Sequence, residues 1–179
     1  MTRFGALALT CTVAAVAAPL PAQQIPAGVR GEILAQFNDA ADKLVQLAEA
    51  MPQDKFTWRP SAGVRSVSEV LLHVAGSNDF MLTSVGVSSA MRGENDLEHS
   101  TTDKTQVIAK LKESNARVRA ALQAMRDADL DTATKLFGGD TTYRGVCLEL
   151  QSHVHEHLGQ MIAYARTNGV VPPWSRGGQ

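Results

Sequence analysis

Apolar residues recur at helical spacing through most of the chain. Between about Gly31 and Met51 the spacing alternates between four and three residues, at Ile33, Phe37, Ala40, Leu44, Leu47 and Met51. This pattern places one apolar stripe along one side of a helix. A stripe this regular favours packing of the helix within a bundle.

Three more segments show the same period, at about residues 66–87, 103–126 and 143–167. Ser66-Val-Ser-Glu69 has the form of a capping box, which predicts where the second helix begins. Asn168-Gly169 marks the end of the fourth helix. Four helices of about 20 residues are each about 30 Å long. The sequence therefore predicts an all-α fold, a four-helix bundle.

The connections are polar and long, at residues 52–65, 88–102 and 127–142. The first is rich in proline, yet it contains Phe56 and Trp58. We expect these two aromatic residues to hold the loop against the bundle rather than to form a ligand platform.

The first 22 residues differ in composition from the rest of the chain. They combine one arginine and an apolar run that includes Cys11, contain no acidic residue, and end in Ala22. This is the pattern of a secretory signal peptide, although an uncleaved anchor is left open. We expect residues 23–179 to form one domain, secreted or periplasmic, without stable insertion in a membrane.

Charge and cysteine content narrow the function classes. The chain has 17 Lys and Arg against 18 Asp and Glu, a net charge of -1, and no basic patch that would indicate nucleic-acid binding. Only Cys147 lies beyond residue 22, so no intramolecular disulfide is expected. A homodimer is left open.

Histidines carry the candidate chemistry. His153 and His157 lie four residues apart on the fourth helix, about 40° apart around the axis and about 6 Å along it, so both can reach one ion. His155 lies about 200° away from His153. His73, on the apolar side of the second helix, completes a set of three. Three protein ligands leave one coordination position for water or substrate.

The residues around His157 also fit other patterns, each with an observation against it. His153-Val-His-Glu-His157 also matches an H-x-x-E-H peptidase pattern, but no carboxylate side chain follows Arg166 to act as a further ligand. Cys147 lies about 15 Å along the helix from His157, so a buried inert thiol explains it better than a ligand does. Gln160 and Tyr164 lie on nearly the same face as His157, where contact with the ligands and ordinary packing are both open.

The helix phrase Ser66-Val-Ser-Glu-Val-Leu-Leu-His-Val-Ala75, the phrase His153-x-x-x-His157-Leu-Gly-Gln160 and the loop Trp58-Arg-Pro60 resemble the DinB-like metal-binding four-helix bundle superfamily. The resemblance covers about Ile33 to Trp174. It implies an up-down-down-up bundle with a crossover between the second and third helices. It also implies a divalent metal, zinc or nickel, bound by the residues that match the family ligands, His73, His153 and His157.

The resemblance leaves the activity open between three classes. Some members of the family are thiol-dependent transferases, since coordination to a metal deprotonates a thiol and prepares a nucleophile. A metal-dependent hydrolase of a small substrate is the alternative. A stress-associated metal-binding module without catalysis is the third. The sequence identifies neither the substrate nor a pocket for a thiol cofactor.

Overall fold

The computed structural model describes residues 27–91 and 94–177. It contains four long helices, α1 (Gly28–Ala50), α2 (Val67–Thr83), α4 (Lys104–Ala124) and α5 (Tyr143–Thr167). A short helix, α3 (Glu94–Glu98), and an antiparallel hairpin, β1 (Ala133–Leu136) with β2 (Gly139–Thr142), lie in the connections. The proposed signal peptide falls outside the described residues.

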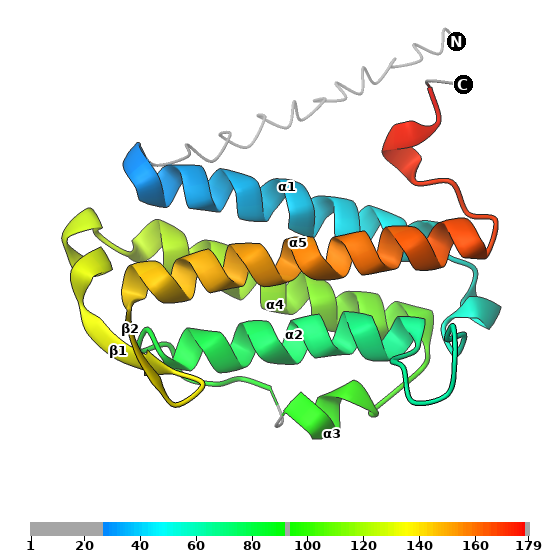
Figure 1. Cartoon of the computed structure of the whole chain (residues 1–179), viewed down its shortest axis with the longest axis horizontal. Helices are drawn as coiled ribbons and strands as arrows, with labels where there is room; N and C mark the ends of the chain where they lie inside the picture. Colours follow the sequence, from blue (N-terminus) through cyan, green and yellow to red (C-terminus); the bar gives the residue numbers. More distant parts are fainter. Residues whose placement is uncertain (1–26, 92–93, 178–179) are drawn as a thin grey trace, which may run out of the picture.

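The long helices form a four-helix bundle, as predicted from the sequence (Figure 1). α1 packs against α5 and α4, and α2 packs against α4 and α5. The sequence colours in Figure 1 show α1 and α5 running in one direction and α2 and α4 in the other. Because α2 and α4 run the same way, the chain between them returns along the bundle and carries α3 on that return.

The apolar stripes meet in one core. Phe37, Leu44 and Leu47 of α1 are fully buried, as are Leu71 and Leu72 of α2. α1 therefore buries the side that the sequence pattern marked as apolar. Burial of such side chains is the main favourable term in folding, at about 25 cal/mol per Å² of apolar surface.

The start of α2 is fixed by its own residues and by the preceding loop. Ser66 accepts a hydrogen bond from the Glu69 amide at 3.4 Å, and the Glu69 carboxylate accepts one from the Ser66 amide at 2.7 Å, which confirms the capping box. The Val67 and Ser68 amides donate to carbonyl groups of the 52–65 loop. The free amides of the first turn are thus paired, so the position of α2 along its axis is set.

Both loop aromatics contact the bundle. Phe56 is fully buried in the core. Trp58 is half-buried and meets the ring of Tyr164 on α5 edge to face, with ring centroids 5.2 Å apart. The loop is therefore held against the ends of α2 and α5, as the sequence indicated.

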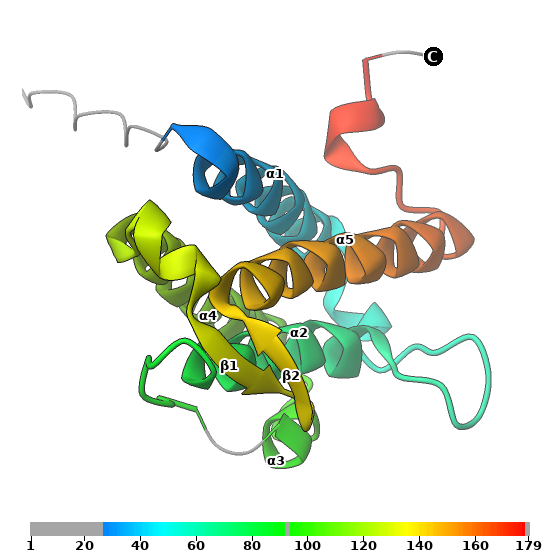
Figure 2. The same ribbon diagram turned by 60° about the vertical axis from the view of Figure 1, so that its left-hand side comes forward.

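Residues 127–142 form a hairpin, whereas their sequence predicts only an irregular connection. β1 and β2 are joined by the two-residue turn Phe137-Gly138, and both residues have positive φ, 50° and 81°. Positive φ at both central residues is characteristic of a type I′ turn, whose backbone twist matches that of the paired strands. Figure 2 shows the hairpin at one end of the bundle and the 52–65 loop at the other.

The crossover from α2 to α3 is held by a buried carboxylate. Asp79 of α2 is 3% exposed and accepts hydrogen bonds from the amides of Ala90 and Met91 at 3.1 to 3.2 Å and from the Ser89 hydroxyl at 2.5 Å. Arg117 of α4 pairs with it at 3.0 Å. Burial acts to raise the pKa of Asp79, but these partners outweigh it and hold the pKa below the ordinary value.

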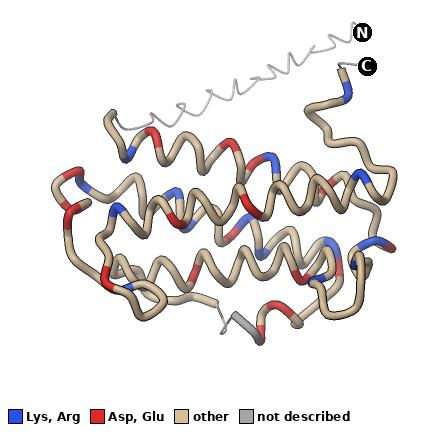
Figure 3. Tube along the Cα trace, viewed as in Figure 1, with Lys and Arg blue, Asp and Glu red and all other residues tan. Residues whose placement is uncertain are grey.

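Figure 3 shows acidic and basic residues interspersed along the helices, and neither sign of charge dominates in this view. Among the described residues, no helix combines the length and the apolar character needed to cross a membrane.

Candidate metal centre

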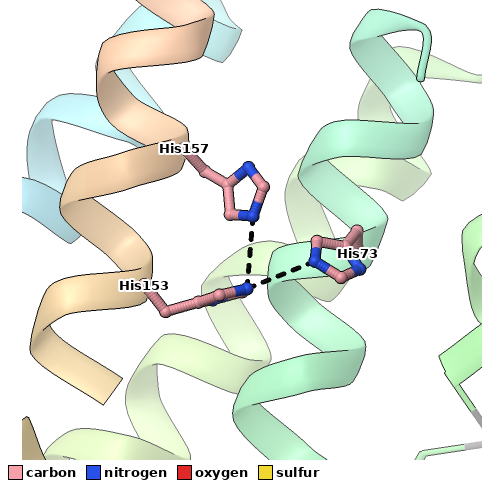
Figure 4. Close-up of side chains that lie close together, drawn as sticks. All are labelled: His73, His153 and His157. Carbon is pink, nitrogen blue, oxygen red and sulfur yellow. Dashed lines mark hydrogen bonds between the residues drawn. The ribbon is translucent and has the colours of Figure 1, made fainter. Parts of the chain in front are cut away.

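Three histidines from two helices converge inside the bundle. His73 lies midway along α2, while His153 and His157 lie one turn apart on α5, which packs against α2. Figure 4 shows the three imidazoles pointing toward one another across the space between these helices. We refer to His73, His153 and His157 as the histidine triad. The structure therefore brings together the three residues that were predicted from the sequence as metal ligands.

The spacing of the triad fits a tetrahedral ion. The His153 Nε2 atom lies 3.2 Å from His73 Nε2 and 3.2 Å from His157 Nε2. One nitrogen from each ring can be chosen so that all three lie within 4.8 Å of one another. A tetrahedral ion with bonds of 2.0–2.1 Å separates two ligand nitrogens by about 3.3 Å. The donor set and its spacing thus suit a divalent metal such as zinc or nickel.

The tautomer of His157 follows from its hydrogen bonds. The Tyr164 hydroxyl donates to the Arg65 carbonyl at 3.0 Å, and therefore accepts from the Gln160 amide NH₂ at 3.0 Å. This orientation turns the Gln160 carbonyl oxygen toward His157 Nδ1, at 2.8 Å. Nδ1 must then carry the proton, and Nε2 presents its lone pair to the centre of the triad.

His73 has an acidic partner on α3. Its Nδ1 atom faces the Glu98 carboxylate at 3.5 Å. Glu98 is only 7% exposed and accepts a hydrogen bond from Arg65 Nε at 2.9 Å. A carboxylate behind a ligand histidine favours the proton on the outer nitrogen and makes the inner nitrogen a better donor to a metal. Arg65 thereby connects the residues behind His73 and His157. Its Nε atom donates to Glu98, and its carbonyl group accepts from Tyr164, whose hydroxyl accepts from Gln160.

His153 differs from the other two histidines. Its Nδ1 atom is buried and has no hydrogen-bond partner among the described residues. The pKa of His153 is lowered to about 3, with burial the largest cause. The two other triad imidazoles and Arg65 act in the same direction. His153 is therefore neutral at neutral pH, the protonation state that metal coordination requires.

We expect the metal-free protein to lose stability in mild acid because of His153. The unfolded chain takes up a proton at His153 near pH 6.5, whereas the folded chain does so only near pH 3. The unfolded state binds more protons between these values, so the stabilisation present above pH 6.5 is lost as pH falls. Urea unfolding in chelator at pH 7 and pH 5 should show a loss from this residue on the order of 1 kcal/mol. The His153→Leu variant should lose less unfolding free energy than the wild type between pH 7 and pH 5. The same loss in both proteins would contradict the low pKa of His153.

Gln160 offers a test of the hydrogen bonds behind the triad. Gln160→Ala removes the acceptor that fixes His157 Nδ1, so zinc affinity should fall about 10- to 100-fold. Gln151→Ala is the matched control, because Gln151 lies on the same helix and contacts His155 rather than a triad member. Competition with a chromophoric chelator gives both affinities. Equal affinities in the two variants would show that Gln160 only packs.

The other two histidines, Glu156 and Cys147 lie apart from the triad. His155 turns back to the Gln151 carbonyl, with its Nδ1 atom 2.8 Å from that oxygen, and Glu156 is exposed. His99 has a side chain that is 67% exposed and lies 3.5 Å from Glu69. Cys147 is buried beside Met125, and burial raises the pKa of its thiol to about 11. The thiol is therefore protonated at neutral pH and poorly suited to nucleophilic chemistry.

Glu98 and Arg65 were not singled out from the sequence. Glu98 lies in the connection 88–102, whose polar sequence predicts no helix, and the burial of Leu97 beside it positions α3 against α2. Arg65 directly precedes the Ser66 cap, so its place follows from the start of α2. The sequence signal for Glu98 is the segment Asp96-Leu97-Glu98, in which one apolar residue is flanked by two acidic residues.

A pocket adjoins the triad. It has a volume of about 490 Å³ and is lined by Gly63, Val64, Arg65, Glu98 and Gln160. Gln160 and Glu98 each contact a triad histidine on their other side. We refer to this space as the adjoining pocket. A small molecule could approach the triad from it.

Comparison with known proteins gives the same family as the sequence motifs. The model of the DinB superfamily matches residues 36–161. The uncharacterized protein YjoA of Bacillus subtilis (strain 168) is 24% identical over 141 residues, which cover 77% of this chain and 90% of YjoA.

Solved structures share the fold. A DinB-like protein from Bacillus cereus ATCC 10987 superposes with a TM-score of 0.70 at 20% identity, covering 81% of this chain and 95% of that one. YfiT from Bacillus subtilis superposes with a TM-score of 0.62 at 18% identity, covering 86% of this chain and 95% of YfiT. YfiT is described as a probable metal-dependent hydrolase with an unusual four-helix bundle topology.

Proposed function

The chain belongs to the DinB superfamily, and we propose that it binds one divalent ion through His73, His153 and His157 and hydrolyses a small substrate there. The convergence of three ring nitrogens, with His153 Nε2 lying 3.2 Å from Nε2 of both His73 and His157, is the observation that carries this proposal. We further propose that the protein acts after export, on the basis of the signal-peptide pattern in residues 1–22.

The chemistry follows from the number of ligands. A divalent ion held by three imidazoles keeps a position for water or substrate, where it would lower the pKa of water and polarise a carbonyl group. The residues of the chain hold and orient the ligands. Gln160 fixes the His157 ring, and Glu98 faces His73. The description of YfiT as a probable metal-dependent hydrolase supports the same reaction class.

A turnover assay tests the proposal. Chelator-treated protein should be inactive on a panel of small esters, amides and lactones, and zinc or nickel should restore activity to at least one of them. The His153→Ala, His157→Ala double variant should stay inactive with metal added. Equal activity with and without metal would contradict a metal-dependent reaction.

The transferase expected from the family resemblance would use the same coordination position, because a thiolate is also a strong zinc ligand. The panel therefore includes a small thiol with an aromatic halide as electrophile. Metal-dependent loss of the halide only with thiol present would favour transfer over hydrolysis. A metal-loaded protein inactive in every assay would favour the non-catalytic binding module.

A further inference from the structure

We propose that Arg65 is a specificity-determining residue that anchors the carboxylate of a small ligand in the adjoining pocket. This inference rests on the proposed metal site and names the class of ligand that the site takes, a monoanionic carboxylate bearing a second group that reaches the triad. It follows from three properties of Arg65: its free edge, its fixed position and its location beside the triad.

The guanidinium of Arg65 is only partly used by the protein. Its Nε atom donates to Glu98 at 2.9 Å, whereas no hydrogen bond or ion pair of its two terminal nitrogens is found within the described residues. The side chain is 40% exposed, and Arg65 lines the pocket. Two parallel N–H groups are thus available, the arrangement that binds a carboxylate through two hydrogen bonds.

Arg65 is held in place before any ligand arrives. Glu98, itself 7% exposed, fixes the guanidinium from one side. The backbone of Arg65 is fixed by the Tyr164 hydroxyl, which donates to its carbonyl group at 3.0 Å. A pre-positioned arginine loses less side-chain freedom on binding than a mobile one, so more of the interaction energy appears as affinity.

Arg65 lies close to the residues that contact the triad. Its Nε atom donates to the Glu98 carboxylate, which faces His73 Nδ1 at 3.5 Å. The pocket walls Glu98 and Gln160 are the same side chains that contact His73 and His157. A ligand held at Arg65 therefore lies beside the two side chains that contact His73 and His157.

The charge balance of the pocket favours a carboxylate over a phosphate. Among the described residues that line the pocket, Arg65 is the one cationic side chain, and Glu98 offsets part of its charge. A dianionic phosphate group would face this carboxylate with only one arginine to compensate. A monoanion needs one guanidinium edge, which is what the pocket provides.

Matched hydroxamates test the inference on zinc-loaded protein. Acetohydroxamate carries only the metal-binding group, whereas succinate and glutarate monohydroxamate carry the same group with a carboxylate on a shorter or longer arm. Calorimetric titration should show at least one carboxylated probe binding about 10-fold or more tightly than acetohydroxamate, because its carboxylate adds charge-assisted hydrogen bonds to the Arg65 guanidinium. Arg65→Gln should abolish this preference, which is measured in each variant as the ratio of its affinities for the carboxylated probe and for acetohydroxamate.

The control variant is Arg166→Gln, which removes the same charge from an exposed position on α5 outside the pocket and should keep the preference. If Arg65→Gln loses its zinc, Arg65→Lys replaces it, since lysine keeps the charge beside Glu98 but lacks the two-nitrogen edge; the preference should then fall several-fold. Equal binding of all probes by the wild type, or a preference that survives both Arg65 variants, overturns the inference while the metal site stands. Absence of bound zinc from the wild type overturns the proposed function and this inference together.

Discussion

Replacing His157 with alanine should abolish tight metal binding. His157 is the most deeply buried histidine of the triad, at 6% exposure, and its ring is fixed by Gln160. Loss of an outer hydrogen-bond partner alone costs about 10- to 100-fold in metal affinity, so loss of a ligand should cost more than about 100-fold. Competition with a chromophoric chelator measures the affinity of the wild type and the variant for zinc.

His155→Ala is the control for this experiment. His155 lies on the same helix, two residues from both His153 and His157, yet turns to the Gln151 carbonyl. Its replacement should leave zinc affinity within about twofold of the wild type, because the residue contributes to neither the triad nor its partners. Equal losses in both variants would mean that the metal is bound elsewhere, or that the helix and not the ligand had been damaged.

Asp79→Asn should destabilise the fold without removing the metal ligands. Removal of one partner of a buried ion pair is strongly destabilising, and we expect a loss of about 3 kcal/mol. Neutral asparagine also weakens the hydrogen bonds from Ser89 and from the amides of Ala90 and Met91. Urea unfolding of the metal-free protein at pH 7 gives the free energy of unfolding.

Asp131→Asn is the matched control, because Asp131 pairs with Arg144 at the surface with a side chain 77% exposed and should contribute at most about 1 kcal/mol.

The stabilisation by Asp79 should also depend on pH. Since its pKa is lowered in the folded protein, its stabilisation is complete above the ordinary value of 3.8 and is lost as pH falls below it. A difference between wild type and Asp79→Asn that persists undiminished at pH 2.5 would contradict this explanation.

The long helices were predictable because their signals are local. The period of Phe37, Leu44 and Leu47 depends on one helix only, and the capping box at Ser66 depends on four consecutive residues. The pairing of His153 with His157 is likewise fixed by helical geometry. The fold class and the two triad histidines on α5 could therefore be derived from the residues themselves.

The rest depends on contacts between distant segments. Glu98 reaches His73 only because the crossover brings α3 alongside α2, and no spacing in the sequence encodes that approach. Arg65 meets Glu98 across 33 residues for the same reason. The hairpin was missed because Phe137 takes the positive φ of the turn, a conformation uncommon for an aromatic residue.

The central claim is that the histidine triad binds a metal ion with a position left for water or substrate. X-ray absorption at the zinc edge of the loaded, untagged protein tests it most directly. The account predicts three imidazole nitrogens at about 2.0–2.1 Å and at least one further oxygen that a hydroxamate displaces. A sulfur ligand at about 2.3 Å, or four protein ligands that no added molecule displaces, would contradict it.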